Sequence, residues 1–332
     1  MAGVTRSRET KNGAISNLPI IFAESTTWAC PVAMEAYVFV IGAGGSGSSA
    51  RRAATSTAGT HQGAGAGGCA VSKLTLAAQN YTVTIGAGGA SGGTQAANDS
   101  SLAGSDGGAS SFAGTGISTM AGNGGAGGAV SNVSNGAVSS AAAGGTATGG
   151  TLMNNTGGSS PALTDNSNPS LSSGGGVGLW GPGQDGQAFV GTGYTYLEGG
   201  KPQGRDGLSL EKVSSAVGEA RPWTSYILGL VSAETAVNDS YYQTRQYAPP
   251  GAAQTGDEIG GYYYTAAGLV ATFPSGPLSG GPAMRRNLGI RRGGCSLGGG
   301  GGASTTVNYN SYSYRDSGGS GGVIIIPISI GL

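Results

Sequence analysis

Twice in this chain a short apolar run ends directly in glycine, and this arrangement limits the folds available to it. Tyr37–Ile41 (YVFVI) continues into Gly42–Gly47 (GAGGSG), and Tyr81–Ile85 (YTVTI) continues into Gly86–Gly92 (GAGGASG). Runs rich in Val, Ile, Tyr and Phe favour β-strands. Glycine has no side chain with which to fill a core. The sequence therefore predicts a scaffold in which strands continue as glycine-rich segments.

The first of these junctions has the spacing of a dinucleotide-binding loop, because Gly42, Gly44 and Gly47 form G-x-G-x-x-G after a strand. That loop needs a helix N-terminus for the pyrophosphate and an acidic residue about twenty residues later. Near position 62 the chain instead has HQGAGAGG, with no acidic residue. In a chain of 332 residues with 69 glycines, such matches arise by chance. We therefore predict no bound cofactor.

The charge balance and the small number of potential metal ligands argue against two further classes of function, nucleic-acid binding and metal binding. Charged residues are 10% of the chain and the formal net charge is zero, which does not favour binding to nucleic acid. Cys30, Cys69 and Cys295 have no CxxC spacing, so we interpret them as small buried thiols. A single histidine, His61, cannot build a zinc site. We therefore predict no metal centre.

The apolar segments are short. None reaches the roughly 20 residues that span a bilayer, so we predict no membrane insertion. Leu18–Ala23 is the apolar run near the N-terminus, and a signal peptide needs a longer one. We expect synthesis and folding in a cytoplasm.

Glycines in three places recur at every third position, and we interpret this spacing as structural. These are Gly86, Gly89 and Gly92, then Gly122, Gly125 and Gly128, then Gly175, Gly178 and Gly181. The polyproline II helix has three residues per turn, and glycine lets such helices approach until their backbones bond. We therefore predict a bundle of short glycine helices, ordered through residues 86–150. The alternative is a flexible linker.

Two further strand predictions complete the scaffold. Lys73–Leu76 and Tyr81–Ile85 are separated by AAQN, which predicts a short hairpin. Val323–Ile330 (VIIIPISI) predicts a strong final strand, which needs a partner.

Composition divides the chain into four parts. Between residues 187 and 292 glycine becomes scarcer, and tyrosine and arginine accumulate. We predict a mainly β and irregular fold, in which short strands continue into a bundle of polyproline-II-type helices with a Tyr/Arg-rich insertion. The predicted parts are an N-terminal attachment arm (1–25), a glycine-rich scaffold (26–186), the insertion with the recognition region (187–292), and a glycine-rich closure with the final strand (293–332).

Four motifs, in order, resemble the glycine-rich domain of bacteriophage tail-fibre and tail proteins. TTWACPVAMEAYVFVIGAGGSG resembles the opening of that domain, with Trp28, Pro31 and the first strand-to-glycine junction in the expected places. YTVTIGAGG, GGASSFAG and GGSGGVIIIPI are similar to its second junction, its GG-x-S-S-F element and its closing strand. The resemblance covers about residues 26–186 and 293–330. Distal adhesins of T-even-like phages are similar in having variable loops at the tip of such a bundle.

This resemblance implies a structural protein of the virion tail, either a tail fibre or a tail tip, that binds a host receptor. The receptor would be a polysaccharide or an outer-membrane protein, and the arm would contact other tail proteins. Fibre proteins are usually trimeric, so the resemblance favours a homotrimer, with a monomeric adhesin on a separate shaft as the alternative. We predict that the chain is not an enzyme.

We place receptor binding in the insertion, because Tyr, Trp and Arg give large contact area at low entropic cost. The alternative is that these aromatic residues form the core of the insertion. The loop Tyr309–Tyr314 is a second candidate. The predicted receptor-binding residues are Trp223, Tyr241, Tyr242, Arg245, Tyr262 and Tyr263.

Two other functions stay open at this point. A polysaccharide depolymerase needs two carboxylates about 5–9 Å apart. Its candidates are Asp185, Asp206, Asp257 and Glu258. An ice-binding or wall-type glycine-rich structural protein would use the same scaffold, but has no need of a Tyr/Arg-rich insertion.

Overall fold

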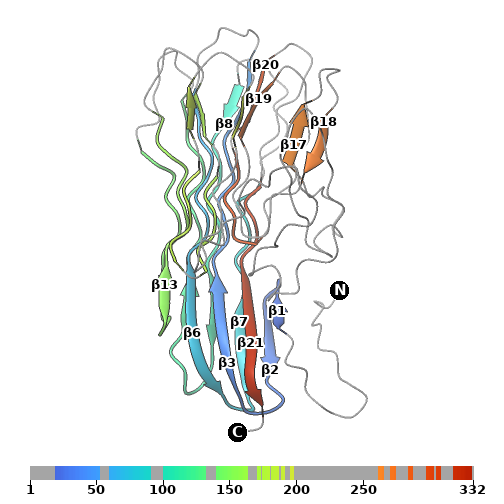
Figure 1. The fold of residues 1–332 in the computed structure, drawn as a ribbon, viewed down its shortest axis with the longest axis vertical. Coiled ribbons are helices and arrows are strands. Elements are labelled where there is room, and N and C mark those ends of the chain that lie inside the picture. The colour runs from blue at the N-terminus through green and yellow to red at the C-terminus, as the bar shows by residue number, and fades with distance from the viewer. Residues whose placement is uncertain are drawn as a thin grey trace, which may run out of the picture.

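A computed structural model gives the fold of this chain, which is elongated and built from strands (Figure 1). A two-sheet sandwich lies at one end, glycine-rich segments run lengthwise through the middle, and further strands lie at the other end, which we call the distal end. None of the described residues is in a helix. The structure describes residues 19–52, 60–90, 100–131, 140–163, 170–172, 174–179, 181–186, 188–190, 195–197, 261–264, 270–273, 283–286, 297–302, 304–307 and 317–330.

The first sheet of the sandwich is antiparallel and contains the predicted final strand as one of its inner strands. Its order is β1 (Ile20–Phe22), β21 (Gly322–Ile330), β3 (Met34–Ile41), β6 (Cys69–Leu76) and β13 (Met153–Asn155). The final strand therefore has partners on both sides, with Val323 opposite Val40 in β3. Next to Pro327 the register shifts, and β1 pairs β21 only as far as Ile325. Proline, which lacks an N–H donor, thus lies where pairing is already interrupted.

The second sheet is also antiparallel, and it corrects the predicted hairpin. Its order is β12 (Ala147–Thr148), β10 (Met120–Gly122), β9 (Ser110–Ala113), β7 (Asn80–Thr84) and β2 (Thr26–Ala29). The strands predicted to pair across AAQN, β6 and β7, lie in different sheets. The hairpin prediction is wrong because each strand buries one face against the opposite sheet instead of pairing with the other.

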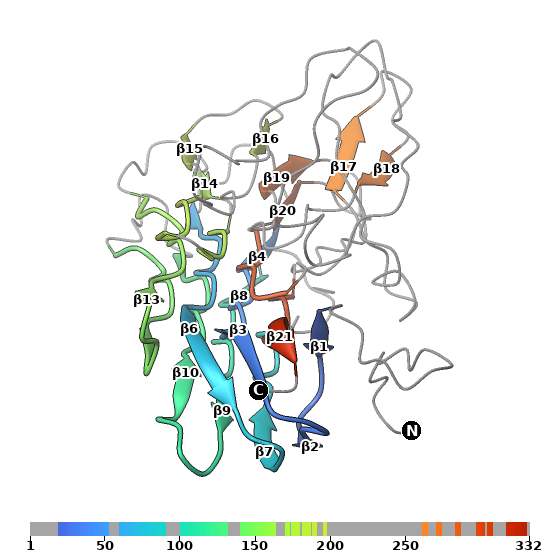
Figure 2. The same ribbon diagram turned by 60° about the horizontal axis from the view of Figure 1, so that its bottom comes forward.

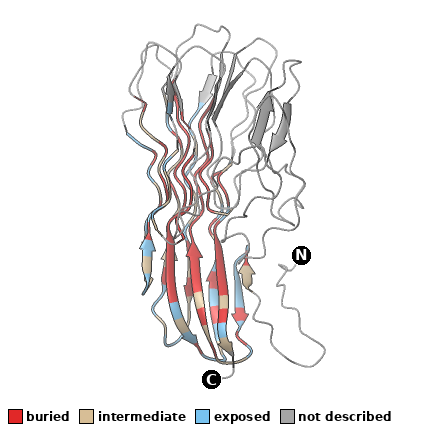
Figure 3. Cartoon of the chain, viewed as in Figure 1, coloured by how far each residue is buried: buried red, intermediate tan, exposed pale blue. Residues whose placement is uncertain are grey.

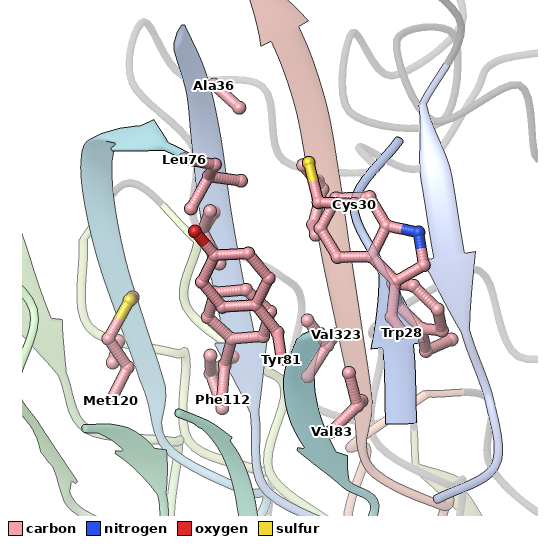
Figure 4. Packing of buried hydrophobic residues seen from close by; sticks show 14 of the residues in the cluster. Trp28, Cys30, Ala36, Leu76, Tyr81, Val83, Phe112, Met120 and Val323 are labelled. Carbon is pink, nitrogen blue, oxygen red and sulfur yellow. The ribbon is translucent and has the colours of Figure 1, made fainter. Parts of the chain in front are cut away.

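Aromatic side chains fill the core between the two sheets (Figure 4). Tyr81 stacks on Phe112 with ring centroids 5.1 Å apart and an interplanar angle of 13°. Trp28 packs at 5.8 Å from both Tyr81 and Phe22, in a tilted and an edge-on arrangement respectively. Offset and edge-on contacts of this kind are the favoured geometries of aromatic pairs. Trp28 thus joins the edge strand β2 to the core.

Both faces of β3 are covered over its second half, which explains its continuous apolar sequence. Val38 and Val40 face the core between the sheets, whereas Phe39 and Ile41 belong to a second cluster on the other face. Val177 and Leu179 pack in that second cluster. Figure 3 shows the buried residues concentrated along β3, β6 and β21.

The glycine-rich segments continue the strands of both sheets as layers. Segments 42–48 and 62–68 adjoin β3 and β6, and the amides of Gly42 and Gly45 donate to the carbonyls of Gly68 and Gly65 at 2.8 and 3.0 Å. Segments 86–90, 103–109, 123–129 and 140–146 adjoin β7, β9, β10 and β12. The two layers bond to each other as well, because the amide of Gly125 donates to the carbonyl of Ala43 at 2.9 Å. Backbone groups in the interior are thereby satisfied without a ladder of regular sheet.

The predicted bundle of polyproline II helices is wrong. The described residues are organised in sheets, two of them antiparallel, and contain no helix. The three-residue spacing has another cause, which is contact between layers. Gly122, Gly125 and Gly128 are buried against the backbone of segment 62–68, where an added Cβ would overlap carbonyl oxygens. These three positions therefore have to be glycine, because each of them faces the adjacent layer.

The distal end contains two mixed sheets and a hairpin (Figure 2). In the first mixed sheet β14 (Ser170–Ser172) is parallel to β5 (Thr60–His61), and in the second β20 (Ser304–Val307) is parallel to both β19 (Ala283–Arg286) and β4 (Ser49–Arg52). The order of the first is β11 (Val130–Ser131), β5 (Thr60–His61), β14 (Ser170–Ser172) and β15 (Ala188–Val190). The second, which we call the distal sheet, has the order β16 (Thr195–Leu197), β19 (Ala283–Arg286), β20 (Ser304–Val307), β4 (Ser49–Arg52) and β8 (Ser100–Leu102). The hairpin pairs β17 (Gly261–Tyr264) with β18 (Val270–Phe273).

Candidate functional site at the distal end

Two of the predicted receptor-binding residues lie in a described strand at the distal end. Tyr262 and Tyr263 are in β17, opposite Thr272 and Ala271 of β18. Figure 1 shows this hairpin at the end of the molecule away from the sandwich. The other candidates, Trp223, Tyr241, Tyr242 and Arg245, and the loop Tyr309–Tyr314, lie outside the described residues. A binding role for all of them stays a prediction.

The distal end brings together strands that are far apart in the sequence. In the distal sheet, β4 at residues 49–52 lies beside β20 at residues 304–307, and β20 lies beside β19 at residues 283–286. The strands β16 and β19, from the predicted insertion, thus share a sheet with β4 and β8 of the predicted scaffold. Such an arrangement can present side chains from several loops on one rigid support.

Most amides of the glycine run after β3 already donate hydrogen bonds to neighbouring segments. The amides of Gly42, Gly44 and Ser46 donate to the carbonyls of Gly68, Gly319 and Ser105 at 2.8, 2.9 and 2.9 Å. A dinucleotide loop uses such amides to hold the pyrophosphate. These glycines therefore hold the layers together, in agreement with the structural interpretation of the motif.

Gln62 is a buried polar residue that the sequence analysis missed. Its Nε2 donates to the carbonyls of Ser140 and Pro161 at 2.8 and 3.0 Å, and its Oε1 accepts from the amide of Ala129 at 3.1 Å. Its backbone amide donates to Oγ of Ser48 at 2.8 Å. Gln62 therefore joins four segments just beneath the distal end. The sequence feature that could have identified Gln62 is its position, because its long amide side chain directly precedes a run of Gly and Ala.

The described carboxylate among the depolymerase candidates has a structural role. Oδ1 of Asp185 accepts a hydrogen bond from the amide of Ser159 at 2.7 Å, and Oδ1 of Asp106 does the same for Gly127. Each acid holds a neighbouring glycine-rich segment in place. Asp206, Asp257 and Glu258 lie outside the described residues.

The described cysteines are buried free thiols, as predicted. Desolvation raises the pKa of Cys30, and a backbone hydrogen bond with Val32 acts in the opposite direction. Burial raises the pKa of Cys69 further. A thiol of high pKa is a poor nucleophile at neutral pH. Cys295 lies outside the described residues.

Two further features of the described residues concern metal binding and membrane insertion. His61 is buried in β5, and no group of three described His, Cys, Asp or Glu residues is placed to hold a metal ion. Within the same described ranges, no helix has the length and apolar character needed to cross a membrane.

Comparison with known families identifies the scaffold. A family model described as "Glycine-rich domain" matches residues 21–326. The chain belongs to this glycine-rich domain family. The matched range begins before the first strand-to-glycine junction and ends within the final strand. No curated protein matches the sequence significantly.

Proposed function

We propose that this glycine-rich domain protein is a structural component of a bacteriophage tail, a tail fibre or a tail tip, and binds the host-cell receptor through its distal end. The observation that carries the proposal is the elongated scaffold, in which glycine-rich layers hold strands from distant parts of the chain at one end. The four motifs that resemble tail proteins support it. The family itself is defined by its glycine-rich domain and does not specify a virion.

The chemistry of the layers supports placing recognition at the distal end. Glycine-rich segments present few side chains, and the polar ones that are described, such as Gln62 and Asp185, bind neighbouring backbone. Binding to a receptor needs aromatic and charged groups with area and direction. The Tyr-rich strand β17 lies at the distal end, so the proposed receptor contacts include Tyr262 and Tyr263.

The proposal includes partners within the virion. We place the chain in the virion tail as a homotrimer, with residues 1–25 contacting other tail proteins. Ile20–Phe22, within this arm, forms β1 at the edge of the first sheet. Edge strands present unpaired backbone groups that a second chain can use.

A cell-binding assay tests the receptor-binding function. The labelled full chain is incubated with a panel of bacterial strains, and the expected result is saturable binding to a small number of them. Tyr262→Ala/Tyr263→Ala should lose at least about tenfold in affinity, as expected for interface aromatics. Thr82→Ala/Thr84→Ala, two exposed positions on β7 of the sandwich, is the matched control and should bind normally. Equal binding to all strains, or none to any, contradicts the proposal.

A further inference from the structure

The distal sheet brings together two arginine pairs that are more than two hundred residues apart in the sequence. The chain has three Arg–Arg dipeptides, at positions 51–52, 285–286 and 291–292. The first ends β4 and the second ends β19, and only β20 lies between these strands. The topology, not the sequence, makes the two dipeptides neighbours.

The register places one arginine of each pair in the same cross-strand row. Arg286 is opposite Thr306, and Thr306 is opposite Arg51. Arg51 is in turn opposite Ser100 of β8. Strands in a sheet are about 4.8 Å apart, so the backbones of Arg51 and Arg286 are separated by about 10 Å. The row therefore has the composition Arg, Thr, Arg, Ser.

The strands of the distal sheet supply no opposite charge. Their described sequences are TYL, AMRR, STTV, SARR and SSL, which include four arginines and no aspartate or glutamate. The whole chain, by contrast, has 16 basic and 16 acidic residues. Like charges in neighbouring rows of a sheet repel each other unless solvent or an anion compensates them. The strands of the sheet thus carry positive charge alone, on a protein whose formal net charge is zero.

We propose that the row Arg286–Thr306–Arg51 binds the anionic groups of an acidic polysaccharide. Arginine is the side chain best suited to carboxylate, sulfate or phosphate, because its guanidinium group donates two parallel hydrogen bonds. Threonine and serine in the same row add hydroxyl donors. A separation of about 10 Å fits two charged groups along one chain better than a single small anion. The inference rests on the proposed function and specifies its receptor as a glycan that carries negative charge.

A glycan fits the observations better than nucleic acid. Proteins that follow a phosphate backbone have a continuous basic surface and a basic domain overall. Here the net charge is zero, and the basic residues of the distal sheet are confined to two of its five strands. Binding of duplex DNA is therefore included in the test as a competing outcome.

Binding of the full chain to dextran sulfate, with neutral dextran and duplex DNA as comparisons, tests the inference. We expect the chain to bind dextran sulfate, to ignore neutral dextran, and to lose affinity as salt rises. Arg51→Gln/Arg286→Gln should weaken the binding at least about tenfold, because two charge-assisted contacts are lost. Lys73→Gln removes a charge from the sandwich, where Lys73 pairs with Glu35 at 3.3 Å, and should leave the affinity unchanged. Thermal unfolding of each variant shows whether it is folded.

A charge-conserving variant and the cell-binding assay complete the test. Arg51→Lys/Arg286→Lys keeps both charges, so it should retain more affinity than the Gln variant, even if the Gln variant folds poorly. Unchanged affinity in a folded Gln variant, equal loss in Lys73→Gln, or tighter binding of DNA than of dextran sulfate would overturn the inference. If the arginine variants bind bacterial cells normally while Tyr262→Ala/Tyr263→Ala does not, the anion site fails and the receptor-binding function stands. If the chain binds dextran sulfate but no cell, the proposed function fails and the anion site stands.

Discussion

The carbonyl oxygen of Gly42 lies so close to Gly67 that a Cβ atom added to Gly67 would overlap it. The two residues belong to adjoining segments of one layer, which are joined by a hydrogen bond of 2.8 Å from the amide of Gly42 to the carbonyl of Gly68. No side chain can move aside to make room, because the obstructing atoms belong to the backbone. Glycine at position 67 is therefore a packing requirement of the layer.

Replacement of Gly67 by alanine is predicted to destabilise the protein strongly. Overpacking of an interior costs about 1–3 kcal/mol, and a clash with backbone belongs at the upper end of that range. We expect Gly67→Ala to lower the free energy of unfolding by about 3 kcal/mol in a denaturant titration.

Gly181 provides the control for that prediction. The space around an added Cβ there is open, so Gly181→Ala should change the free energy of unfolding by less than about 1 kcal/mol. Equal stability of the two variants would show that the layers do not pack as closely as described here.

The amide of Gln62 is predicted to be essential for stability although it takes part in no chemistry. Gln62→Glu would place a carboxylate oxygen against the carbonyls of Ser140 and Pro161, which now accept hydrogen bonds from Nε2. Unsatisfied buried polar groups cost about 1–3 kcal/mol each, so we expect a loss of at least about 2 kcal/mol at pH 7.

The same substitution at Gln79 is the matched control. Its Nε2 donates to the carbonyl of Thr115 at 2.7 Å in an exposed position. Water can replace that partner, and Gln79→Glu should therefore cost less than about 1 kcal/mol. A loss at Gln62 as small as that at Gln79 would contradict the role assigned to Gln62.

The thiol of Cys69 is predicted to be unreactive until the protein opens. Burial raises the pKa of Cys69, so the thiol stays protonated in the native state at a pH where the unfolded thiol ionises, near 8.5. Its contribution to stability is complete below that pH and is lost as the pH rises above it. At pH 8, iodoacetamide should modify Cys69 at least about a hundredfold more slowly in the native chain than in guanidinium, as peptide mass spectrometry can measure. Comparable rates in the two states would show that β6 is exposed.

Local patterns in the sequence predicted the strands better than their partners. The apolar run before Gly42 correctly predicted β3, and VIIIPISI correctly predicted β21. Both predictions succeeded because strands that are buried on both faces consist largely of consecutive apolar residues. The pairing of β6 and β7 was predicted incorrectly, because a short connection between two strands is compatible both with a hairpin and with a crossing between sheets. The spacing of Gly122, Gly125 and Gly128 has a structural cause, as predicted, but the cause is not a polyproline II helix. A period of three also results when one residue in three faces another layer.

Fewer residues of the candidate site than of the fold could be predicted from the sequence. The tyrosines of β17 stand out by composition, whereas Arg51 and Arg286 become neighbours only through the parallel pairing of β20 with β4 and β19. Two distant Arg–Arg dipeptides give no indication in the sequence that they lie in the same sheet. Contacts of high sequence separation are set by topology, which no local pattern specifies.

Hydrogen exchange across residues 86–150 tests the central claim most directly, which is that the glycine-rich segments are a packed scaffold. The amides of Gly104, Gly107 and Gly125 donate to the carbonyls of Gly128, Gly125 and Ala43 at 2.7, 2.9 and 2.9 Å. The account predicts that peptides covering 103–109 and 123–129 exchange at least about a hundredfold more slowly than an unstructured chain. Exchange at random-coil rates throughout these peptides would contradict it, because the layers would then not exist in solution.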